Sequence, residues 1–153
     1  MIPQKLALAG PMGVGKSTVG KLLAARHGRS FVDLDQEIGD IPAIWAQEGE
    51  AGFRQRERAT LEKVVGREAV LALGGGTVVD PNNRAMLEGW KVVVLMAPVA
   101  VLAQRIGGSG RPLAGQMEAL WQRRQESWRA AGPWVEAEGD PEQVADAVEA
   151  LCA

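Results

Sequence analysis

The sequence predicts one α/β domain in three layers, in which helices cover both faces of a central, mostly five-stranded parallel sheet. Short, continuous apolar runs alternate with longer amphipathic stretches along the chain, and strands that are apolar throughout are typical of parallel sheets buried on both faces. A chain of 153 residues with 46% hydrophobic residues suits a single domain with one sizeable core. Because no internal repeat or linker interrupts the alternation, we expect residues 1–153 to form one domain.

Five short apolar runs are the candidate strands, because continuous apolar segments of this length are typical of buried parallel strands. Gly10 ends the first run, and a row of glycines beginning at Gly74 ends the third. The fourth run, Val-Val-Val-Leu-Met, has the strongest strand character. In chain order the five runs are residues 5–9, 30–32, 69–73, 92–96 and 134–136.

Six stretches between and after these runs are candidate helices. In the first, Val19 and Leu23 recur at helical spacing, and Gly28 follows as a stop signal. In the third, Asp80 is a helix cap and Pro81 suits the first turn. The six stretches are residues 16–27, 53–65, 80–87, 98–106, 117–130 and 141–151.

Composition disfavours several classes of protein. The 17 basic and 19 acidic residues give a net charge of −2, whereas a general nucleic-acid binder usually carries a positive excess. No apolar stretch approaches the roughly 18 residues that a membrane-spanning helix needs. We therefore expect neither a nucleic-acid nor a membrane partner. The single cysteine, Cys152, excludes an internal disulfide, which agrees with a reducing, cytoplasmic location.

The segment from Gly10 to Ser17 matches the phosphate-binding loop (P-loop) pattern G-x-x-x-x-G-K-[ST], between an apolar strand and a helix. Glycines let backbone N–H groups turn toward phosphate oxygens, and the start of a helix adds partial positive charge. Lys16 would supply a full charge to the β- and γ-phosphates of a nucleotide, and Ser17 would offer a hydroxyl to Mg²⁺. The alternative interpretation is a glycine-rich turn that binds nothing. Because no guanine-reading N-K-x-D tetrad occurs, the loop indicates a small phosphotransferase or an ATP-dependent regulator.

Two carboxylates follow the second strand. Residues two apart on a strand point the same way, so we expect Asp33 and Asp35 to face the same site. Asp33 is expected to hold a water on Mg²⁺. Asp35, further out, is expected to accept protons from substrate hydroxyls. The alternative is a strand-to-helix turn capped by an aspartate.

Two further patterns suit an acceptor site at the carboxyl ends of the strands. Arg54 and Glu57 are three apart on a helix, so the carboxylate can present the guanidinium to an anionic substrate; alone, this pair also reads as a surface ion pair. The glycines at 74–76 leave no side chain to obstruct a ligand that approaches the backbone, although a plain tight turn is the alternative.

In order along the chain, the motifs G-x-x-G-x-G-K-S-T, D-x-D, G-E-x-x-F-R-x-x-E, G-G-G and R-P-L resemble those of the shikimate kinases. These are P-loop phosphotransferases related to the nucleoside monophosphate kinases, and the resemblance covers nearly the whole chain. It implies a P-loop kinase fold with a substrate-cover segment at about residues 36–60 and a short lid at about residues 107–116. It also implies a monomer that transfers the γ-phosphate of ATP, with Mg²⁺, to the 3-hydroxyl of shikimate. The products, shikimate 3-phosphate and ADP, belong to the route to aromatic amino acids.

The resemblance assigns three parts of the chain to the nucleotide. Arg111 matches the lid arginine that reaches the transferring phosphate, and Arg105 and Pro141 match positions that flank the adenine. Lys16, Arg111 and Mg²⁺ would neutralise the moving phosphoryl group. The metal would bind Ser17 directly and Asp33 through water. The residues expected to bind ATP are Gly13, Val14, Gly15, Lys16, Ser17, Thr18, Arg105, Arg111 and Pro141.

The resemblance also implies the acceptor site. Asp35 would hydrogen-bond the hydroxyls and act as the base, and two arginines would hold the carboxylate. Arg124 is expected to be the second of them, with Arg123 and Arg129 as alternatives within a short register shift. The residues expected to bind shikimate are Asp35, Arg54, Gly75, Gly76 and Arg124.

The sequence departs from the family pattern in places. The cover is shorter around residues 38–42, and Trp128 stands where the family has a tyrosine. Trp45 is expected either to line the acceptor pocket or to pack in the core, and His27 to end the first helix without a catalytic role.

Two other functions stay open, namely a related gluconate-type kinase and a kinase-like domain that binds nucleotide and regulates a partner. Arg54 and Arg124 together with Asp35 favour shikimate over gluconate. A purely regulatory domain has no physical need for the full set of Lys16, Ser17, Asp33, Asp35 and Arg111.

Overall fold

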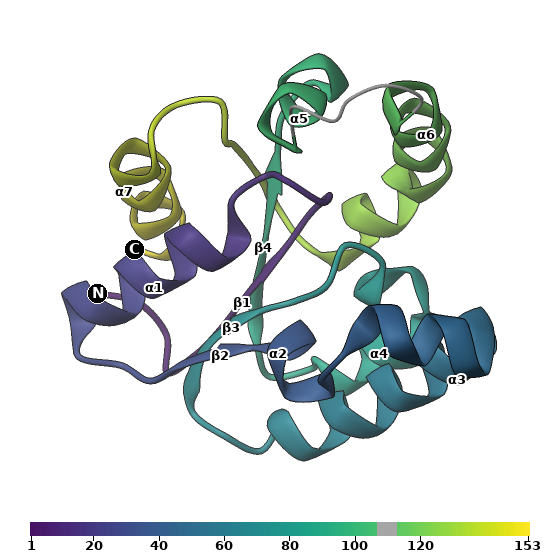
Figure 1. Cartoon of the computed structure of the whole chain (residues 1–153). Coiled ribbons are helices and arrows are strands. Elements are labelled where there is room, and N and C mark those ends of the chain that lie inside the picture. Colours follow the sequence, from purple (N-terminus) through teal and green to yellow (C-terminus); the bar gives the residue numbers. More distant parts are fainter. Residues whose placement is uncertain (107–112) are drawn as a thin grey trace.

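The computed structural model of the chain describes residues 1–106 and 113–153. Within these residues, five parallel strands form one sheet in the order β2–β3–β1–β4–β5 (Figure 1). In the register of the central strands, Leu6 lies beside Val70 on one side and Lys91 on the other. The predicted fold class is confirmed. The strands are β1 (Lys5–Ala9), β2 (Phe31–Asp33), β3 (Ala69–Ala72), β4 (Lys91–Met96) and β5 (Trp134–Glu136).

The helices follow the expected order, with additions around residues 34–52 and 77–79. None of the helices among the described residues is both long enough and apolar enough to cross a lipid bilayer. The helices are α1 (Lys16–His27), α2 (Leu34–Ile38), α3 (Ile41–Val64), the 3₁₀ helix η1 (Thr77–Val79), α4 (Pro81–Met86), α5 (Val99–Ile106), α6 (Leu113–Ala131) and α7 (Pro141–Cys152).

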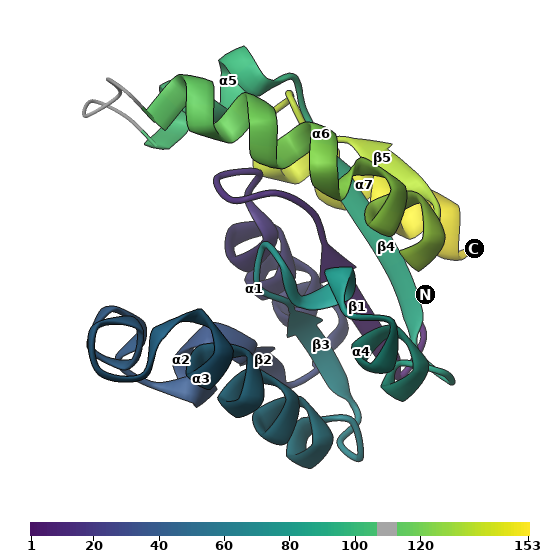
Figure 2. The ribbon, with the colours of Figure 1, turned by 90° about the vertical axis from the view of Figure 1, so that its right-hand side faces the viewer.

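Side chains alternate along the strands and form one core on each face of the sheet. Leu6 and Leu8 pack into a core that residues of α1, α5 and α7 complete. Ala7 and Ala9 point the other way, into a core completed by residues of α3 and α6. Figure 2 shows α6 running along the upper side of the molecule, with α2 and α3 at the lower side. This arrangement puts two long helices on opposite sides of the region where the central strands end.

Aspartates begin three of the helices. Asp80, the expected cap, accepts a hydrogen bond of 2.8 Å from the backbone N–H of Asn82 at the start of α4. Asp40 caps α3 and Asp140 caps α7 in the same way. Each of the three helices has a proline at its first or second position. The carboxylates satisfy backbone N–H groups that the first turn of a helix leaves unpaired, which fixes where these helices begin.

The structure differs from the sequence-based expectation between residues 34 and 52. The expected helix 53–65 is only the second half of α3, which begins at Ile41 and kinks at Gly49 (φ 70°, ψ −172°). This backbone conformation is essentially restricted to glycine, and it breaks the periodicity by which a helix is read from sequence. The second strand also ends one residue later than expected, at Asp33.

Candidate active site

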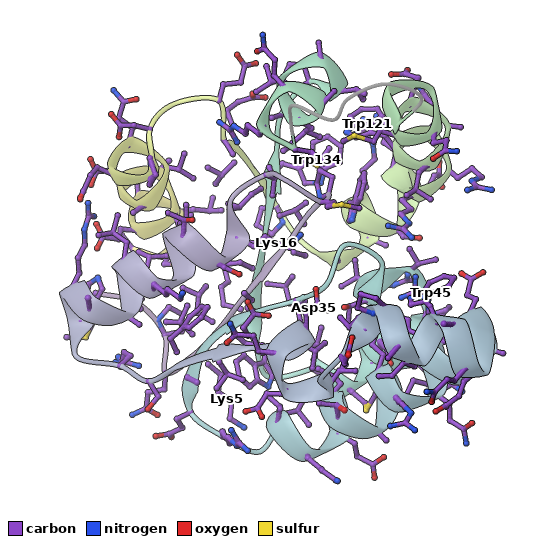
Figure 3. The ribbon with its side chains drawn as sticks, in the orientation of Figure 1. Lys5, Lys16, Asp35, Trp45, Trp121 and Trp134 are labelled. Atoms are coloured by element: carbon purple, nitrogen blue, oxygen red, sulfur yellow. The ribbon has the colours of Figure 1, made fainter. Side chains whose placement is uncertain are left out.

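A cavity of about 990 Å³ opens at the carboxyl ends of the strands, where α/β sheets usually bind ligands. Figure 3 shows Lys16, Asp35 and Trp45 following one another from the P-loop toward α3 in this region. The cavity is lined by the P-loop, the end of β2, the cover segment, the glycine turn after β3, and α6. Eleven of the residues expected at the site line it, namely Gly13, Gly15, Lys16, Ser17, Thr18, Asp33, Asp35, Arg54, Gly75, Gly76 and Arg124.

The P-loop is curled around its own lysine. Gly13 and Gly15 have φ values of 84° and 103°, which glycine adopts without steric cost. Lys16 Nζ donates hydrogen bonds of 2.6 and 3.0 Å to the carbonyl oxygens of Gly10 and Pro11. Burial lowers the pKa of the Lys16 ammonium to about 8, although the negative charges of Asp35 and Asp33 act to raise it. The ammonium therefore lies at the floor of the loop, where a phosphate oxygen can replace a carbonyl oxygen as its partner.

Asp33 joins the P-loop to the acceptor side of the cavity. Its Oδ2 accepts a hydrogen bond of 2.6 Å from Ser17 Oγ. Its Oδ1 accepts from the backbone N–H groups of Asp35 and Gln36, and so caps α2. The expectation that both aspartates project from one strand was wrong, because Asp35 lies in the first turn of α2. The alternative interpretation, a strand-to-helix turn capped by an aspartate, is therefore observed, while the other oxygen of Asp33 is bonded to Ser17.

Asp35 has an environment that suits a base. Burial raises the pKa of its carboxyl above the ordinary range, and the negative charge of Asp33 adds to this effect. Lys16 and Arg54 act in the opposite direction. A Cβ added to Gly74 would lie 2.9 Å from Asp35 Oδ1, so the carboxyl lies against the first glycine of the turn.

Two guanidinium groups converge on the last glycine of the same turn. A Cβ added to Gly76 would lie 2.7 Å from Arg54 Nη2 and 2.9 Å from Arg124 Nη2. Glu57 Oε1 accepts a hydrogen bond of 2.7 Å from Arg54 Nη1 and fixes that side chain. Burial, and then the charge of Arg54, lower the pKa of Arg124. Two cations held this close together form a site for an anion such as a carboxylate.

The alternative arginines lie in different surroundings. Arg123 also lines the cavity, but the three atoms nearest to the Gly76 Cβ position belong to Arg54 and Arg124. Arg129 stacks its guanidinium on the ring of Trp134, 4.6 Å from the centroid. The geometry thus favours Arg124 as the partner of Arg54.

Three other residues expected to bind the nucleotide lie around a second cavity of about 270 Å³. It is lined by Val14, Arg105 and Pro141 together with glycines of the P-loop. Arg105 donates hydrogen bonds to the carbonyl oxygens of Val14 and Ala137, at 3.1 and 2.8 Å. It therefore ties α5 to the P-loop and to the segment between β5 and α7. Arg111 and the first part of the expected lid lie outside the described residues.

Aromatic residues divide between the site and the core. Trp45 lines the large cavity and stacks on Phe53, with 5.6 Å between ring centroids. Trp128, which stands where the family has a tyrosine, is buried in the core, edge-on to Trp121. His27 ends α1, where its Nε2 lies 2.6 Å from Glu149 Oε2.

Sequence reasoning missed some residues that shape the site. Gly74 belonged to the glycine run that we singled out but not to the residues expected to bind shikimate, and it lies against Asp35. Thr77 is fully buried behind the turn. Phe53, which was not among the residues expected at the site, also lines the cavity. The run of glycines was a signal for Gly74, whereas nothing in the sequence distinguishes Thr77 from a surface threonine.

Comparisons with known proteins point to one family. The profile of the family described as shikimate kinase matches residues 12–150. A shikimate kinase of Synechococcus elongatus is 41% identical over 152 residues, which cover 90% of this chain and 80% of the relative. One of Nitrosomonas europaea is 49% identical over 111 residues, covering 68% of this chain and 53% of the relative.

Solved structures give the same picture. Shikimate kinase from Acinetobacter baumannii in complex with shikimate has a TM-score of 0.90 and 36% identity, covering 99% of this chain and 93% of that one. A gluconokinase from Sinorhizobium meliloti covers 99% of this chain and 94% of that one, with a TM-score of 0.68 and 19% identity, and so shares the fold alone. Because the family profile spans most of the sequence and relatives match along nearly its whole length, this chain belongs to the shikimate kinase family.

Proposed function

We propose that this chain transfers the γ-phosphate of ATP to the 3-hydroxyl of shikimate, in the route to the aromatic amino acids. The observation that carries the proposal is the layout of the turn from Gly74 to Gly76. Its first glycine lies against Asp35, and its last lies against Arg54 and Arg124. A small cyclic acid with hydroxyl groups, laid along this turn, puts a hydroxyl at the base and its carboxylate between the arginines.

The reaction then needs little beyond positioning and charge neutralisation. The 3-hydroxyl oxygen bonds to the γ-phosphorus while the bond from that phosphorus to the β–γ bridging oxygen breaks, and ADP leaves with the electron pair. Asp35 accepts the hydroxyl proton, and its raised pKa favours this transfer. Lys16 neutralises the phosphate oxygens from the floor of the P-loop. Arg111 is proposed to approach the same group from the lid.

The oxygen donors at the P-loop fit Mg²⁺. Ser17 Oγ and Asp33 Oδ2 lie 2.6 Å apart and both residues line the large cavity. Among residues 1–106 and 113–153 there is no cluster of three or more His, Cys, Asp or Glu side chains suited to a metal. Such a cluster is not needed, since Mg²⁺ is usually held by one or two carboxylates with substrate phosphates and water. When bound, the ion would neutralise β- and γ-phosphate oxygens.

The remaining parts of the proposal concern the cover and the assembly. Residues 36–60, within α2 and α3, are proposed to cover the acceptor, with residues 107–116 as the lid. The resemblance to the shikimate kinases supports a monomer. The net charge of −2 and the single cysteine support a cytoplasmic enzyme without a nucleic-acid partner.

The test is release of ADP from Mg-ATP, measured with shikimate, with gluconate and with no acceptor. We expect fast turnover with shikimate alone, because the two arginines and Asp35 are spaced by one short turn. Turnover with gluconate instead would replace the proposal with a gluconate-type kinase. Tight ATP binding without turnover on either acceptor would favour a regulatory domain.

A further inference from the structure

Among the described residues, three polar residues have at most 1% of their surface exposed to solvent, namely Glu57, Thr77 and Asn83. They come from three elements, namely α3, η1 and the start of α4. Buried polar groups are normally hydrogen-bonded, because burial removes their contacts with water. All three belong to one connected hydrogen-bond chain behind the glycine turn.

Thr77 is the centre of that chain. Its Oγ1 accepts a hydrogen bond of 2.9 Å from the backbone N–H of Gly74 and donates one of 2.9 Å to Glu57 Oε2. The other oxygen of Glu57 accepts from Arg54 Nη1 at 2.7 Å. A hydroxyl has one donor and two acceptor sites. Here the O–H donates to the carboxylate that holds Arg54, and one acceptor site receives the N–H of the glycine turn.

The turn is also held from its other side. The side-chain Nδ2 of Asn83 donates a hydrogen bond of 2.9 Å to the carbonyl oxygen of Thr77. The backbone N–H of Thr77 donates to the carbonyl oxygen of Gly74 at 3.3 Å. Thr77 therefore has its N–H, its carbonyl and its hydroxyl all engaged, and it cannot shift without disturbing Gly74.

Gly74 is the point where the two ends of the acceptor site meet. A Cβ at this position would lie 2.9 Å from Asp35 Oδ1, 3.1 Å from Thr77 Oγ1 and 3.4 Å from Glu57 Oε2. The hydroxyl of Thr77 thus fixes two groups. One is Gly74, which borders Asp35, and the other is the Glu57 carboxylate, which orients Arg54. Thr77 itself is fully buried and is not among the residues that line the cavity.

We propose that Thr77 is a positioning residue that sets the spacing between Asp35 and Arg54. This inference rests on the proposed function, because it assumes that one acceptor molecule engages both groups. Through the Gly74 N–H and the Glu57 carboxylate, the hydroxyl holds the base and the carboxylate site in register before the acceptor binds. Among the described residues, none of the hydrogen bonds in this chain involves a P-loop residue, so we expect the effect to be specific to the acceptor.

The experiment compares Thr77→Val, which removes the hydroxyl at nearly constant volume, with Thr77→Ser, which keeps it. We expect Thr77→Val to raise the KM for shikimate at least about 10-fold and to leave the KM for ATP within about twofold. Thr77→Ser should stay near the unsubstituted protein. The matched control is Thr60→Val, the same change on α3 at a residue that does not line the cavity. Equal changes in both KM values, or no change, would overturn the inference.

The path through Arg54 has its own test. In an Arg54→Ala background, Thr77→Val should add little to the KM for shikimate, because interacting residues are not additive. Full additivity would mean that Thr77 does not act through Arg54. The unsubstituted protein is assayed in the same series. Absence of its turnover on shikimate refutes the proposed function, whereas normal turnover together with an unaffected Thr77→Val refutes only this inference.

A measurement on the unsubstituted protein covers the case in which Thr77→Val does not fold. The Gly74 amide is buried and bonded to Thr77 Oγ1, so it should be protected from hydrogen exchange without shikimate as well as with it. Free exchange of that amide in the absence of shikimate would show that the turn is not held in advance.

Discussion

Glu48 and Arg56 form a two-pronged ion pair across the kink in α3. Arg56 Nε donates to Glu48 Oε1 at 3.1 Å, and Arg56 Nη2 donates to Glu48 Oε2. These hydrogen bonds lower the pKa of Glu48 and raise that of Arg56. The residue between the two halves, Gly49, has φ 70° and ψ −172°. The pair therefore links the half of α3 that carries Trp45 to the half that carries Arg54.

The kink predicts a double effect of Gly49→Ala. No atom lies within 4 Å of a Cβ at this position, so the cost comes from the backbone and should be about 1–3 kcal/mol of stability. We also expect a higher KM for shikimate, because Trp45 lines the cavity from the half of α3 before the kink, so a change in the kink displaces it. Thermal unfolding and initial rates measure the two effects. Gly28 ends α1 in a left-handed conformation and also has open space around its Cβ position. Gly28→Ala should therefore lower stability without changing the KM for shikimate.

The convergence at Gly76 predicts different effects for two adjacent arginines. Arg124→Ala should raise the KM for shikimate about 10- to 100-fold, since a hydrogen bond to a charged group contributes about 1.5–3 kcal/mol. The KM for ATP should stay nearly constant. Arg123→Ala is the matched control, and steady-state kinetics distinguish the two. A larger effect at Arg123 would mean that the second arginine is one residue away from our assignment.

The environment of Asp35 predicts an acid limb in the pH profile. Because burial and Asp33 raise the pKa of Asp35, it becomes protonated, and unable to accept a proton, at a pH above the ordinary aspartate range. The kcat/KM for shikimate should therefore begin to fall there as the pH drops. Asp35→Asn should lower kcat by at least ~10² and remove this limb. Unchanged rates in that variant would exclude Asp35 from the site.

The lysine of the P-loop predicts an alkaline limit on nucleotide binding. Burial lowers the pKa of Lys16 to about 8, so the ammonium is charged below this pH and loses its proton as the pH rises through it. ATP affinity, measured by titration calorimetry, should fall above about pH 8. Lys16→Arg keeps its charge and should show a flat profile, whereas Lys16→Met should abolish transfer in a folded protein. A flat profile in the unsubstituted protein would contradict the prediction.

The same shift has a consequence for stability. The unfolded chain retains the lysine proton up to about 10.5, above the folded value of about 8. Since the unfolded state then binds more protons, the contribution of Lys16 to stability rises with pH between these values. Lys16→Met should lose this dependence in unfolding experiments.

Local patterns determined much of the molecule. The apolar run from Lys5 to Ala9, the cap at Asp80 and the P-loop could be predicted, because each depends on residues close together in sequence. The first half of α3 could not, since the conformation of Gly49 interrupts the helical periodicity.

The tertiary structure alone decided the assembly of the proposed acceptor site. It brought Arg124 rather than Arg129 to Gly76, and it buried Thr77 between the glycine turn and Glu57. These outcomes depend on how α3, η1 and α6 pack around the ends of the strands. Sequence spacing shows which residues share one helix face, but the rotation of one helix relative to another is set by the packing of both cores.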